Sequence, residues 1–415
     1  MAKFYGWRVV GAAFVLAFFG WGLGFYGPPV YLQAVREARG FSLATVSTAV
    51  TIHYLAGAIV VANVPALYRR FGLPAVTLVA AILLSAGVAG WAVAAAPWQL
   101  FAATLVSGSG WAAMGGVAVN AVVSPWFVRT RPVALGTAYN GASFAGLIFS
   151  PLWVFAIALM GFPAAAAAIG VATVIVVGIL AGRFFARTPL EMSLAPDGDA
   201  PGAPAASVTS PRAKPLAGSS LWRDFGFITL AAGSALSLFA QIGMITHLYS
   251  LLVPALGNEW AGLVMGVGTG AGMAGRMVVG WLMPAQADRR RVACISYAVQ
   301  IAGALVLIVA AGSHVPLLLL GVLLFGVGIG NVTSMPPLIV QVEFVKEDVP
   351  RAVALVVAIG QATYAFAPAA FGLIREVGTQ SGGAAPYLFA FAALVYALAI
   401  AALLIGRYAA NSARV

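Results

Sequence analysis

The sequence predicts an all-α membrane protein that crosses the bilayer twelve times and folds as two pseudo-symmetric six-helix bundles. Hydrophobic residues make up 62% of the 415-residue chain and charged residues only 8%, with a mean hydropathy of +0.99. This composition is typical of a polytopic membrane protein and not of a soluble domain. Long apolar stretches follow one another along the chain, and patterns of the first half return in the second.

Each apolar stretch is long enough to cross a bilayer as a helix, which needs about 20 residues. The alternating pattern of transmembrane strands is absent from the sequence. Helices are expected because they satisfy every backbone hydrogen bond internally, which lipid cannot do. The expected spans are residues 7–33, 42–67, 73–96, 98–124, 132–158, 162–185, 225–256, 259–284, 291–312, 315–342, 350–374 and 384–408.

Basic residues gather on alternate ends of these spans. With the N-terminus inside, 18 of the 22 Lys and Arg residues fall on inner ends. This bias predicts that both termini are cytoplasmic and that the number of spans is even. The net charge of +11 therefore reflects topology and contact with anionic lipid headgroups, and its spread over separate short loops does not indicate nucleic-acid binding. The alanine-rich composition suggests a bacterial inner membrane.

One long segment interrupts the apolar pattern. Residues 188–222 are rich in Pro, Ala, Gly and Ser, which predicts a flexible cytoplasmic linker. The linker divides the chain into an N-terminal six-helix bundle, residues 1–187, and a C-terminal six-helix bundle, residues 223–415.

Two sequence patterns recur at equivalent places in the halves. Gly108-Ser-Gly110 and Gly326-Val-Gly328 are each followed, 19 and 18 residues after the first glycine, by an aromatic residue near a basic one. The inner loops PALYRR (65–70) and PAQADRR (284–290) form the second pair. A parallel repeat of this kind places a substrate site near the middle of the membrane, between the halves.

Several classes of function find no support. Cys294 is the only cysteine, so an intramolecular disulfide is excluded. Three scattered histidines and one cysteine show no metal-ligand spacing, and no phosphate-binding GxxxxGK[ST] loop is present. No nucleophile and base pair suggests an enzyme, and no cofactor is expected. The first apolar stretch is too long for a signal-peptide core, so we expect an uncleaved first helix.

The twelve spans, the central linker and the basic inner loops resemble the major facilitator superfamily. Its loop between spans 2 and 3 has the approximate motif G-x-L-x-D-R-x-G-R-K, and this chain has PALYRRFG (65–72), in which Leu67, Arg70 and Gly72 match. The acidic residue is replaced here, whereas the loop of the second half keeps Asp288. The resemblance implies the major facilitator fold, and the departure implies a weaker charge interaction at the inner side of the first half.

Four segments resemble a narrower branch, that of bacterial monocarboxylate transporters and oxalate–formate exchangers. They are FYGWRVVGAAFVLAFFGWGLGFY, FSLATVSTA, THLYSLLVPALG and GMAGRMVVGWL. In that branch the arginine of span 8 binds the substrate carboxylate, which implies this role for Arg276, and an amide in span 4 approximately matches Asn120. Oxalate exchangers have a lysine in span 11, and the core of this span has no cation here, which fits a monoanion better.

Arg276 is also the strongest candidate from the residues alone. No other charge occurs between Glu259 and Asp288, and Arg276 lies 12 residues before Asp288, about 18 Å along a helix. A guanidinium at membrane depth costs at least ~2.5–3.5 kcal/mol, and it binds a carboxylate through two parallel hydrogen bonds. Alternatively, Arg276 could hold backbone carbonyls.

The deep parts of the spans contain no Asp or Glu, so any proton coupling must use histidine, substrate or water. His247, in span 7, is the best titratable candidate, although a neutral histidine bonded to a helix carbonyl is the alternative. A packing role is expected for His53 and an exposed position for His314. The remaining candidates for a partly polar substrate site are Tyr26, Asn120, Tyr139, Asn331 and Tyr364, together with Asn140, Tyr249 and Gln361, and each could instead bond between helices.

These features predict a secondary transporter of small organic monocarboxylate anions, similar to lactate or pyruvate, that is coupled to protons. The expected partners are a small carboxylate, a proton and membrane lipid. An exchanger of organic anions, of the oxalate–formate kind, is the main alternative. An exporter of cationic drugs would need acidic groups in the core, and a sensor would need a soluble output domain.

Overall fold

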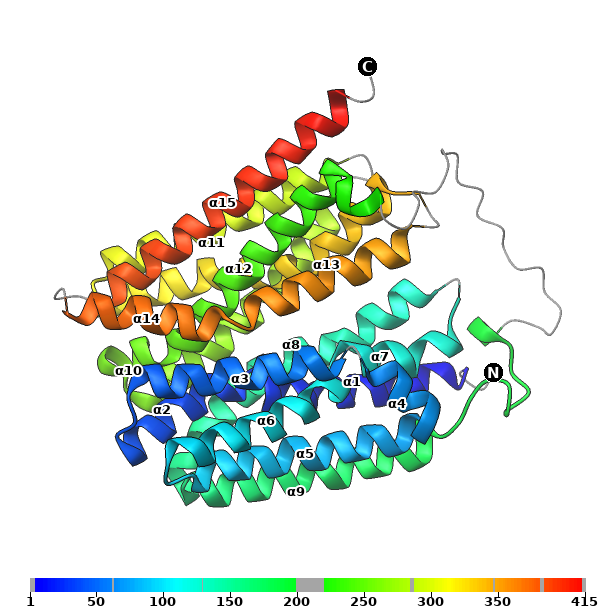
Figure 1. Ribbon diagram of the computed structural model, residues 1–415, viewed down its shortest axis with the longest axis horizontal. Helices are drawn as coiled ribbons and strands as arrows, with labels where there is room; N and C mark the ends of the chain where they lie inside the picture. Colours follow the sequence, from blue (N-terminus) through cyan, green and yellow to red (C-terminus); the bar gives the residue numbers. More distant parts are fainter. Residues whose placement is uncertain are drawn as a thin grey trace. The chain divides into compact units, whose positions relative to one another are not determined.

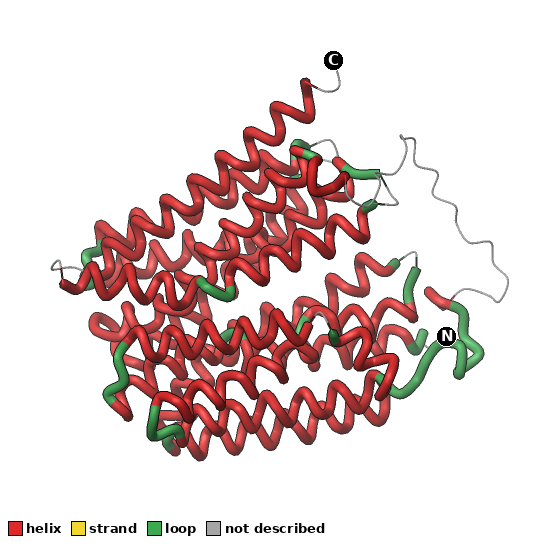
Figure 2. Tube along the Cα trace, viewed as in Figure 1, coloured by secondary structure: helices red, strands yellow, loops and turns green. Residues whose placement is uncertain are grey.

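The computed structural model describes residues 4–61, 63–128, 130–198, 220–283, 287–345, 348–380 and 384–412. Across these ranges all regular structure is helical and strands are absent, which confirms the predicted fold class (Figure 2). The chain divides into two compact units, Met1–Val208 (unit 1) and Thr209–Val415 (unit 2). The division falls inside the segment predicted as a linker, of which residues 199–219 lie outside the described ranges.

Unit 1 has nine α-helices among its described residues, and Figure 1 labels each of them. They are α1 (Gly6–Gly24), α2 (Gly27–Arg39), α3 (Leu43–Val61), α4 (Val64–Phe71), α5 (Leu73–Val93), α6 (Pro97–Met114), α7 (Gly116–Val123), α8 (Arg131–Met160) and α9 (Phe162–Leu180). The π-helical turn Ala181–Phe185 extends α9, and Ser124–Trp126 and Pro196–Gly198 are short 3-10 turns. Within the unit, α1 packs on α8, α3 on α6, and α5 on both α6 and α9.

Unit 2 begins, in its described part, with a 3-10 turn, Ser220–Arg223. Its helices are α10 (Phe225–Leu282), α11 (Arg289–Val309), α12 (Val315–Glu343), α13 (Val349–Tyr364), α14 (Ala367–Gln380) and α15 (Ala384–Ser412). Here α10 packs against α12, α13 and α15, and α11 packs against α12 and α15.

Helix α10 contains two of the predicted spans. Its 58 residues would reach about 87 Å if they were straight, far beyond the ~30 Å hydrocarbon core. Gly257 interrupts the helix with φ 74° and ψ 167°, a conformation that glycine adopts without the clash of a Cβ. Eleven helical runs of described residues are long and apolar enough to cross a membrane, and the break at Gly257 makes one of them two spans, in agreement with the twelve predicted.

Several predicted boundaries were wrong in detail, mostly near proline. The stretch 42–67 ends as α3 at Val61, and the separate helix α4 follows, with Pro65 in its first turn, where a missing N–H is tolerated. Predicted span 1 divides into α1 and α2 before Pro28 and Pro29, whereas α12 continues as a helix through Pro336 and Pro337.

The described start of the predicted linker, residues 188–198, makes several hydrogen bonds. Asp197 accepts hydrogen bonds from the backbone N–H groups of Val128 and Thr130, both at 3.0 Å. Thr188 and Glu191 bond each other's backbone N–H groups in a capping box. The carboxylate of Asp197 thus ties the segment that follows α9 to the loop that precedes α8.

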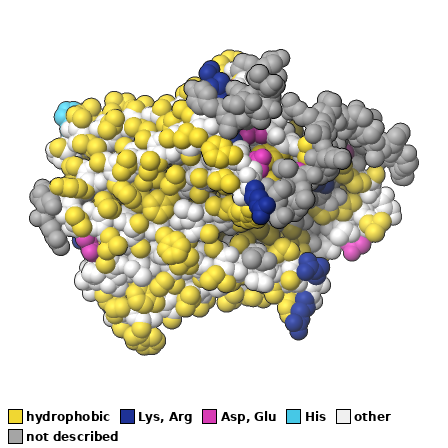
Figure 3. All heavy atoms as spheres, turned by 45° about the horizontal axis from the view of Figure 1, so that its top comes forward, with side chains coloured by type: hydrophobic (Ala, Val, Ile, Leu, Met, Phe, Trp, Pro, Cys, Tyr) yellow, Lys and Arg dark blue, Asp and Glu magenta, His cyan; other side chains and the backbone are white. Residues whose placement is uncertain are grey.

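Large hydrophobic side chains cover much of the outer surface of both units. Leu159 is 82% exposed and Trp281 is 85% exposed. On the face shown in Figure 3, hydrophobic side chains predominate and few charged ones lie among them. Such surfaces need a lipid environment, since soluble proteins rarely expose apolar patches this extensive.

The two units repeat one helix contact residue for residue. In unit 1, a Cβ on Gly108 of α6 would overlap the carbonyl oxygen of His53, and one on Gly57 would lie 3.3 Å from the oxygen of Gly108. In unit 2, a Cβ on Gly326 of α12 would overlap the oxygen of Gly268, and one on Gly272 would lie 2.9 Å from the oxygen of Gly326. This reciprocal approach of paired helices supports the internal repeat that the sequence predicts.

Candidate substrate-binding site

Arg276 lies on the second half of α10 and contacts the middle of α12. It is partly buried, and its Nε–H donates to the carbonyl oxygen of Gly330 at 3.0 Å. Gly330 lies near the centre of α12, so the guanidinium is held at mid-depth of the span that it faces. Arg276 therefore does hold a backbone carbonyl, as the alternative prediction states. This hydrogen bond helps to orient the guanidinium group.

The position of Arg276 depends on a close approach of α10 and α12. A Cβ on Gly330 would overlap the carbonyl oxygen of Gly272 and lie 3.1 Å from Arg276 Nε. A Cβ on Gly275 would overlap the carbonyl oxygen of Val327. Small residues let helix backbones approach in membranes, and here they let a guanidinium on one helix reach a carbonyl of the next.

Gly330→Ala is expected to displace Arg276 and to lower the transport rate at least ~tenfold, because a buried overlap with backbone costs on the order of 1–3 kcal/mol. The matched control is Gly280→Ala on α10, where a Cβ meets nothing within 4 Å. Initial uptake rates per folded protein in proteoliposomes would measure the difference. Equal rates for both variants would contradict the proposed dependence.

His247 lies on the first half of α10 and is fully buried. Its Nε2 lies 2.9 Å from the carbonyl oxygen of Pro368 at the start of α14. A carbonyl only accepts hydrogen bonds, so Nε2 carries a proton and Nδ1 is the atom that gains or loses one. Tyr364, a partly buried residue at the end of α13, precedes Pro368 by one helical turn. His247 is therefore bonded to the start of α14, and Tyr364 ends α13, the helix before it.

Asn120 and Tyr139 come together in unit 1. Asn120 Nδ2 donates to the hydroxyl of Tyr139 at 2.6 Å and to the carbonyl oxygen of Gly116 at 2.8 Å. The Tyr139 hydroxyl donates to the same carbonyl at 3.0 Å. Asn120 is exposed, and the rings of Trp21 and Tyr139 meet edge to face at 6.1 Å. Two predicted residues thus form one polar cluster at the start of α7.

Two other predicted residues are buried. Tyr26 is 7% exposed and lies in the break between α1 and α2, with its ring against that of Phe25 at 4.9 Å. Asn331 follows Gly330 on α12, is 1% exposed, and its Oδ1 has no hydrogen-bond partner among the described residues. An unsatisfied buried acceptor costs about 1–3 kcal/mol, which is typical of a site that receives a donor from a ligand or water.

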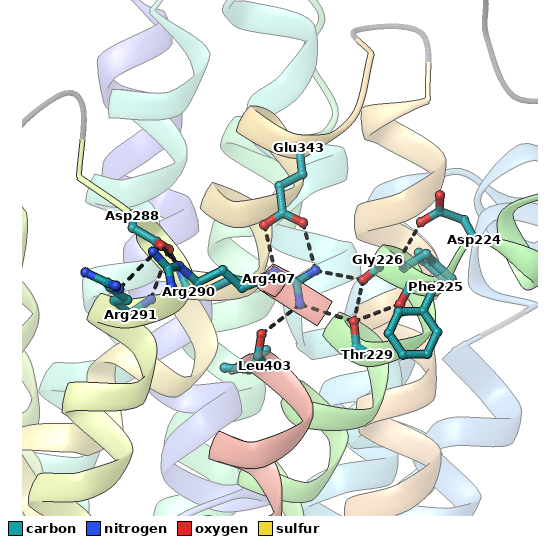
Figure 4. Close-up of polar contacts among 11 residues, drawn as sticks. Asp224, Phe225, Gly226, Thr229, Asp288, Arg290, Arg291, Glu343, Leu403 and Arg407 are labelled. Carbon is teal, nitrogen blue, oxygen red and sulfur yellow. Dashed lines mark hydrogen bonds and ion pairs between the residues drawn. The ribbon is translucent and has the colours of Figure 1, made fainter. Parts of the chain in front are cut away.

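Sequence reasoning missed two buried arginines. Arg290 was expected on an inner loop, but it is 1% exposed and forms a two-bond ion pair with Glu343, at 2.7 and 2.8 Å (Figure 4). Arg375 was expected outside, but it is 9% exposed and its Nη1 donates to Ser250 Oγ at 2.5 Å. The only hint in the sequence was that each stands beside or near an acidic residue, which does not show burial.

The Arg290–Glu343 ion pair joins the ends of four helices. Its Nη1 donates to Thr229 Oγ1 and to the carbonyl oxygen of Leu403, both at 3.1 Å, and its Nη2 donates to the carbonyl oxygen of Gly226 at 2.7 Å. Asp288 caps α11 by accepting from the N–H groups of Arg290 and Arg291, and it also pairs with Arg407. Figure 4 shows these groups converging from α10, α11, α12 and α15.

The structure also places the other two histidines. His314 is exposed and caps α12 by accepting from the N–H of Leu317. His53 is 1% exposed and hydrogen-bonded at both ring nitrogens. Within the described ranges, no three His, Cys, Asp or Glu side chains gather in a way that could hold a metal ion.

Comparison with known proteins identifies the family. The family model described as Major Facilitator Superfamily matches residues 9–344. Comparison with curated proteins gives no match. The similarity to solved structures does not confirm the branch of monocarboxylate and oxalate–formate carriers.

Two solved structures show the same fold. One is the nucleoside transporter NupG, with 12% identity and a TM-score of 0.70 over 98% of this chain and 99% of that chain. The other is a bacterial homologue of the human lysosomal transporter Spinster, inward-facing and occupied, with 13% identity and a TM-score of 0.67 over 99% of this chain and 96% of that chain. The chain therefore belongs to the major facilitator superfamily, and it is a multi-pass membrane protein that acts as a secondary transporter by alternating access and not as an enzyme.

Proposed function

We propose that this transporter carries small organic monocarboxylate anions of the lactate or pyruvate kind, together with protons. The observation that carries the proposal is the guanidinium of Arg276, held by Gly330 at the middle of α12 in a chain whose deep spans contain no Asp or Glu. A cation at membrane depth is costly and marks a substrate pathway more often than a packing role.

Arg276 would bind the carboxylate in a defined orientation. Its Nε–H is held by Gly330, and a planar guanidinium binds a carboxylate through parallel N–H···O bonds. Pairing neutralises the cation, which favours the rearrangement of the two halves with substrate over the same movement without it. A neutral nucleoside offers no charge to the guanidinium, so the likeness to NupG supports the fold and not its substrate.

His247 would bind the transported proton at Nδ1, since its Nε2–H is held by Pro368, and the negative charge of the substrate would balance the buried imidazolium. The unperturbed pKa of histidine lies near 6.5, within reach of physiological pH. Tyr26, Asn120, Tyr139, Asn331 and Tyr364 would complete the polar contacts of the substrate.

An inward proton gradient is expected to stimulate uptake of a monocarboxylate several-fold, because each cycle would carry a proton with the anion. His247→Gln keeps a donor for the carbonyl of Pro368 but cannot titrate, so it should lose this stimulation and retain exchange of labelled for unlabelled substrate. Uptake into proteoliposomes with imposed gradients would measure both. Stimulation that survives in His247→Gln would remove this residue from the coupling.

An organic anion exchanger of the oxalate–formate kind is the second candidate. Arg375 on α14 favours it, because it supplies a buried cation in span 11, although at the outer end of the span. A strict exchanger would show no net uptake into empty liposomes and rapid counterflow into loaded ones. Competition by lactate, pyruvate, formate, oxalate and uridine would show whether the protein binds monocarboxylates, dicarboxylates or nucleosides.

The proposal includes a location and partners. The inner-end basic residues favour a cytoplasmic position for both termini, and the alanine-rich composition suggests a bacterial inner membrane. The partners are then the carboxylate, the proton and anionic lipid, with the monomer as the working unit and no part for nucleic acid.

A further inference from the structure

The break between α1 and α2 leaves backbone carbonyls without their usual partners. The segment Gly27-Pro28-Pro29 opens α2. In a helix, Gly24 O and Phe25 O would accept from the N–H groups of residues 28 and 29, but both of these are proline and have none. An unsatisfied carbonyl is costly in a membrane interior, so these oxygens need donors from elsewhere.

Side chains of two consecutive residues supply donors to these two consecutive carbonyls. His53 Nε2 lies 2.9 Å from Gly24 O, and the hydroxyl of Tyr54 donates to Phe25 O at 3.4 Å. Thus two adjacent residues of α3 stand in for the N–H groups of two adjacent prolines. The two preceding carbonyls are also bonded, Leu23 O by the hydroxyl of Tyr31 at 3.3 Å and Gly22 O by Trp153 Nε1 at 3.1 Å.

The other side of the His53 ring is fixed as well. Nδ1 lies 2.8 Å from Ser107 Oγ, and Trp91 Nε1 donates to the same oxygen at 3.1 Å. Because Gly24 O only accepts, Nε2 bears the proton, so Nδ1 of the neutral ring must accept. The hydroxyl of Ser107 then donates to Nδ1 at 2.8 Å in preference to the carbonyl oxygen of Thr104, which lies farther away at 3.2 Å. A chain of donors therefore runs from α5 through α6 and α3 to the break in α1, and it selects one tautomer.

The surroundings favour the neutral ring. The helices packed against His53 are α1, α5 and α6, and together with α3 they contain no Asp or Glu, while their only Lys or Arg is Arg8 at the inner end of α1. The nearby titratable side chain is Tyr54, whose ring lies 5.2 Å away. An imidazolium here would be a buried cation without an anion, which is strongly disfavoured.

We propose that His53 is a positioning residue of the transport cycle: a fixed, neutral donor that replaces the missing N–H of Pro28 and sets the direction of α2 and of Tyr26 within the break. It does not carry the transported proton. The statement about the proton rests on the proposed proton coupling. The role of His53 as a donor does not, because its hydrogen bonds require only the transporter fold.

The variants His53→Gln and His53→Leu distinguish a neutral hydrogen-bond donor from a carrier of the transported proton. Glutamine can donate to Gly24 O and accept from Ser107 but cannot titrate, so His53→Gln should transport within about twofold of the native rate with an unchanged pH profile. Leucine leaves Gly24 O without a donor and should lower the maximum rate about tenfold, with a smaller change in KM. Native rates in His53→Leu would overturn the proposal, as would a His53→Gln protein that exchanges substrate but no longer responds to a proton gradient.

Pro28→Ala provides an independent test by thermal unfolding of the purified protein, which needs no substrate and so stands even if the proposed anion is wrong. Alanine restores an N–H that can bond Gly24 O, so His53→Leu should lower Tm less in the Pro28→Ala background than alone. If Pro28→Ala and His53→Leu change Tm additively, then His53 does not replace the missing N–H of Pro28, and the proposal is wrong. If His53→Leu does not yield folded protein, the neighbouring donor Tyr54 and Pro29 can be tested in the same way with Tyr54→Phe and Pro29→Ala. Additive changes in Tm for these two variants would also contradict the proposal.

Discussion

Replacing Arg276 with alanine is expected to abolish monocarboxylate uptake while the protein remains folded. Truncating one partner of a buried, hydrogen-bonded charge pair costs about 2–5 kcal/mol of binding free energy, or roughly 30-fold to several thousand-fold in affinity. The fold itself should survive, because Arg276 is only partly buried.

The measurement is initial uptake in proteoliposomes, with protein amount and folding checked by size-exclusion chromatography. Arg276→Lys keeps the charge but loses the planar fork, so it should retain only a small part of the native rate. Arg223→Ala is the matched control, because Arg223 is an exposed cation of the same unit. Uptake by Arg276→Ala at the native rate would exclude the proposed role of the guanidinium.

Stabilisation by ligand checks the same residue without transport. Monocarboxylates should raise Tm of the native protein and not that of Arg276→Ala, since a ligand that binds only the folded state stabilises it by mass action. A shift of equal size in both proteins would place the binding site elsewhere.

Composition and periodicity predicted most of the fold because a backbone that crosses lipid must satisfy its own hydrogen bonds. A run of about 20 apolar residues must be helical wherever it crosses the membrane, so the order of the spans could be read from the chain. The details that failed depend on single backbone positions. The separate helix α4, with Pro65 in its first turn, was missed because hydropathy alone does not resolve it from α3. The break at Gly257 was predicted correctly, between the expected spans 225–256 and 259–284.

The candidate site was predicted less completely, for a physical reason. A lone charge in an apolar run, such as Arg276, is visible in the sequence because its cost does not depend on its neighbours. The partners of a buried group come from distant segments, as Gly24 and Ser107 do for His53. Arg290 looked like any basic residue at an inner helix end, and only the packing of α10, α12 and α15 around it shows that it is buried.

Replacing Glu343 with alanine is expected to destabilise the folded protein by about 3–5 kcal/mol, because it leaves the 1% exposed guanidinium of Arg290 without its counter-charge. Glu343 is itself 22% exposed, so water entering the gap places the expected loss at the lower end of that range. Thermal unfolding in detergent would measure it as a fall in Tm. Glu259→Ala, which removes an exposed acid of the same unit, should leave Tm nearly unchanged.

A second substitution distinguishes a lost charge pair from a damaged helix end. Arg290→Met removes the stranded cation, so Glu343→Ala with Arg290→Met should be more stable than Glu343→Ala alone, even though the carbonyls of Gly226 and Leu403 lose a donor. The native Tm should not be fully restored, because those two carbonyls still lack the donors that Arg290 supplied. If the double variant were the less stable of the two, the bonds of Arg290 to α10 and α15 would matter more than its ion pair with α12, and the charge argument would be wrong.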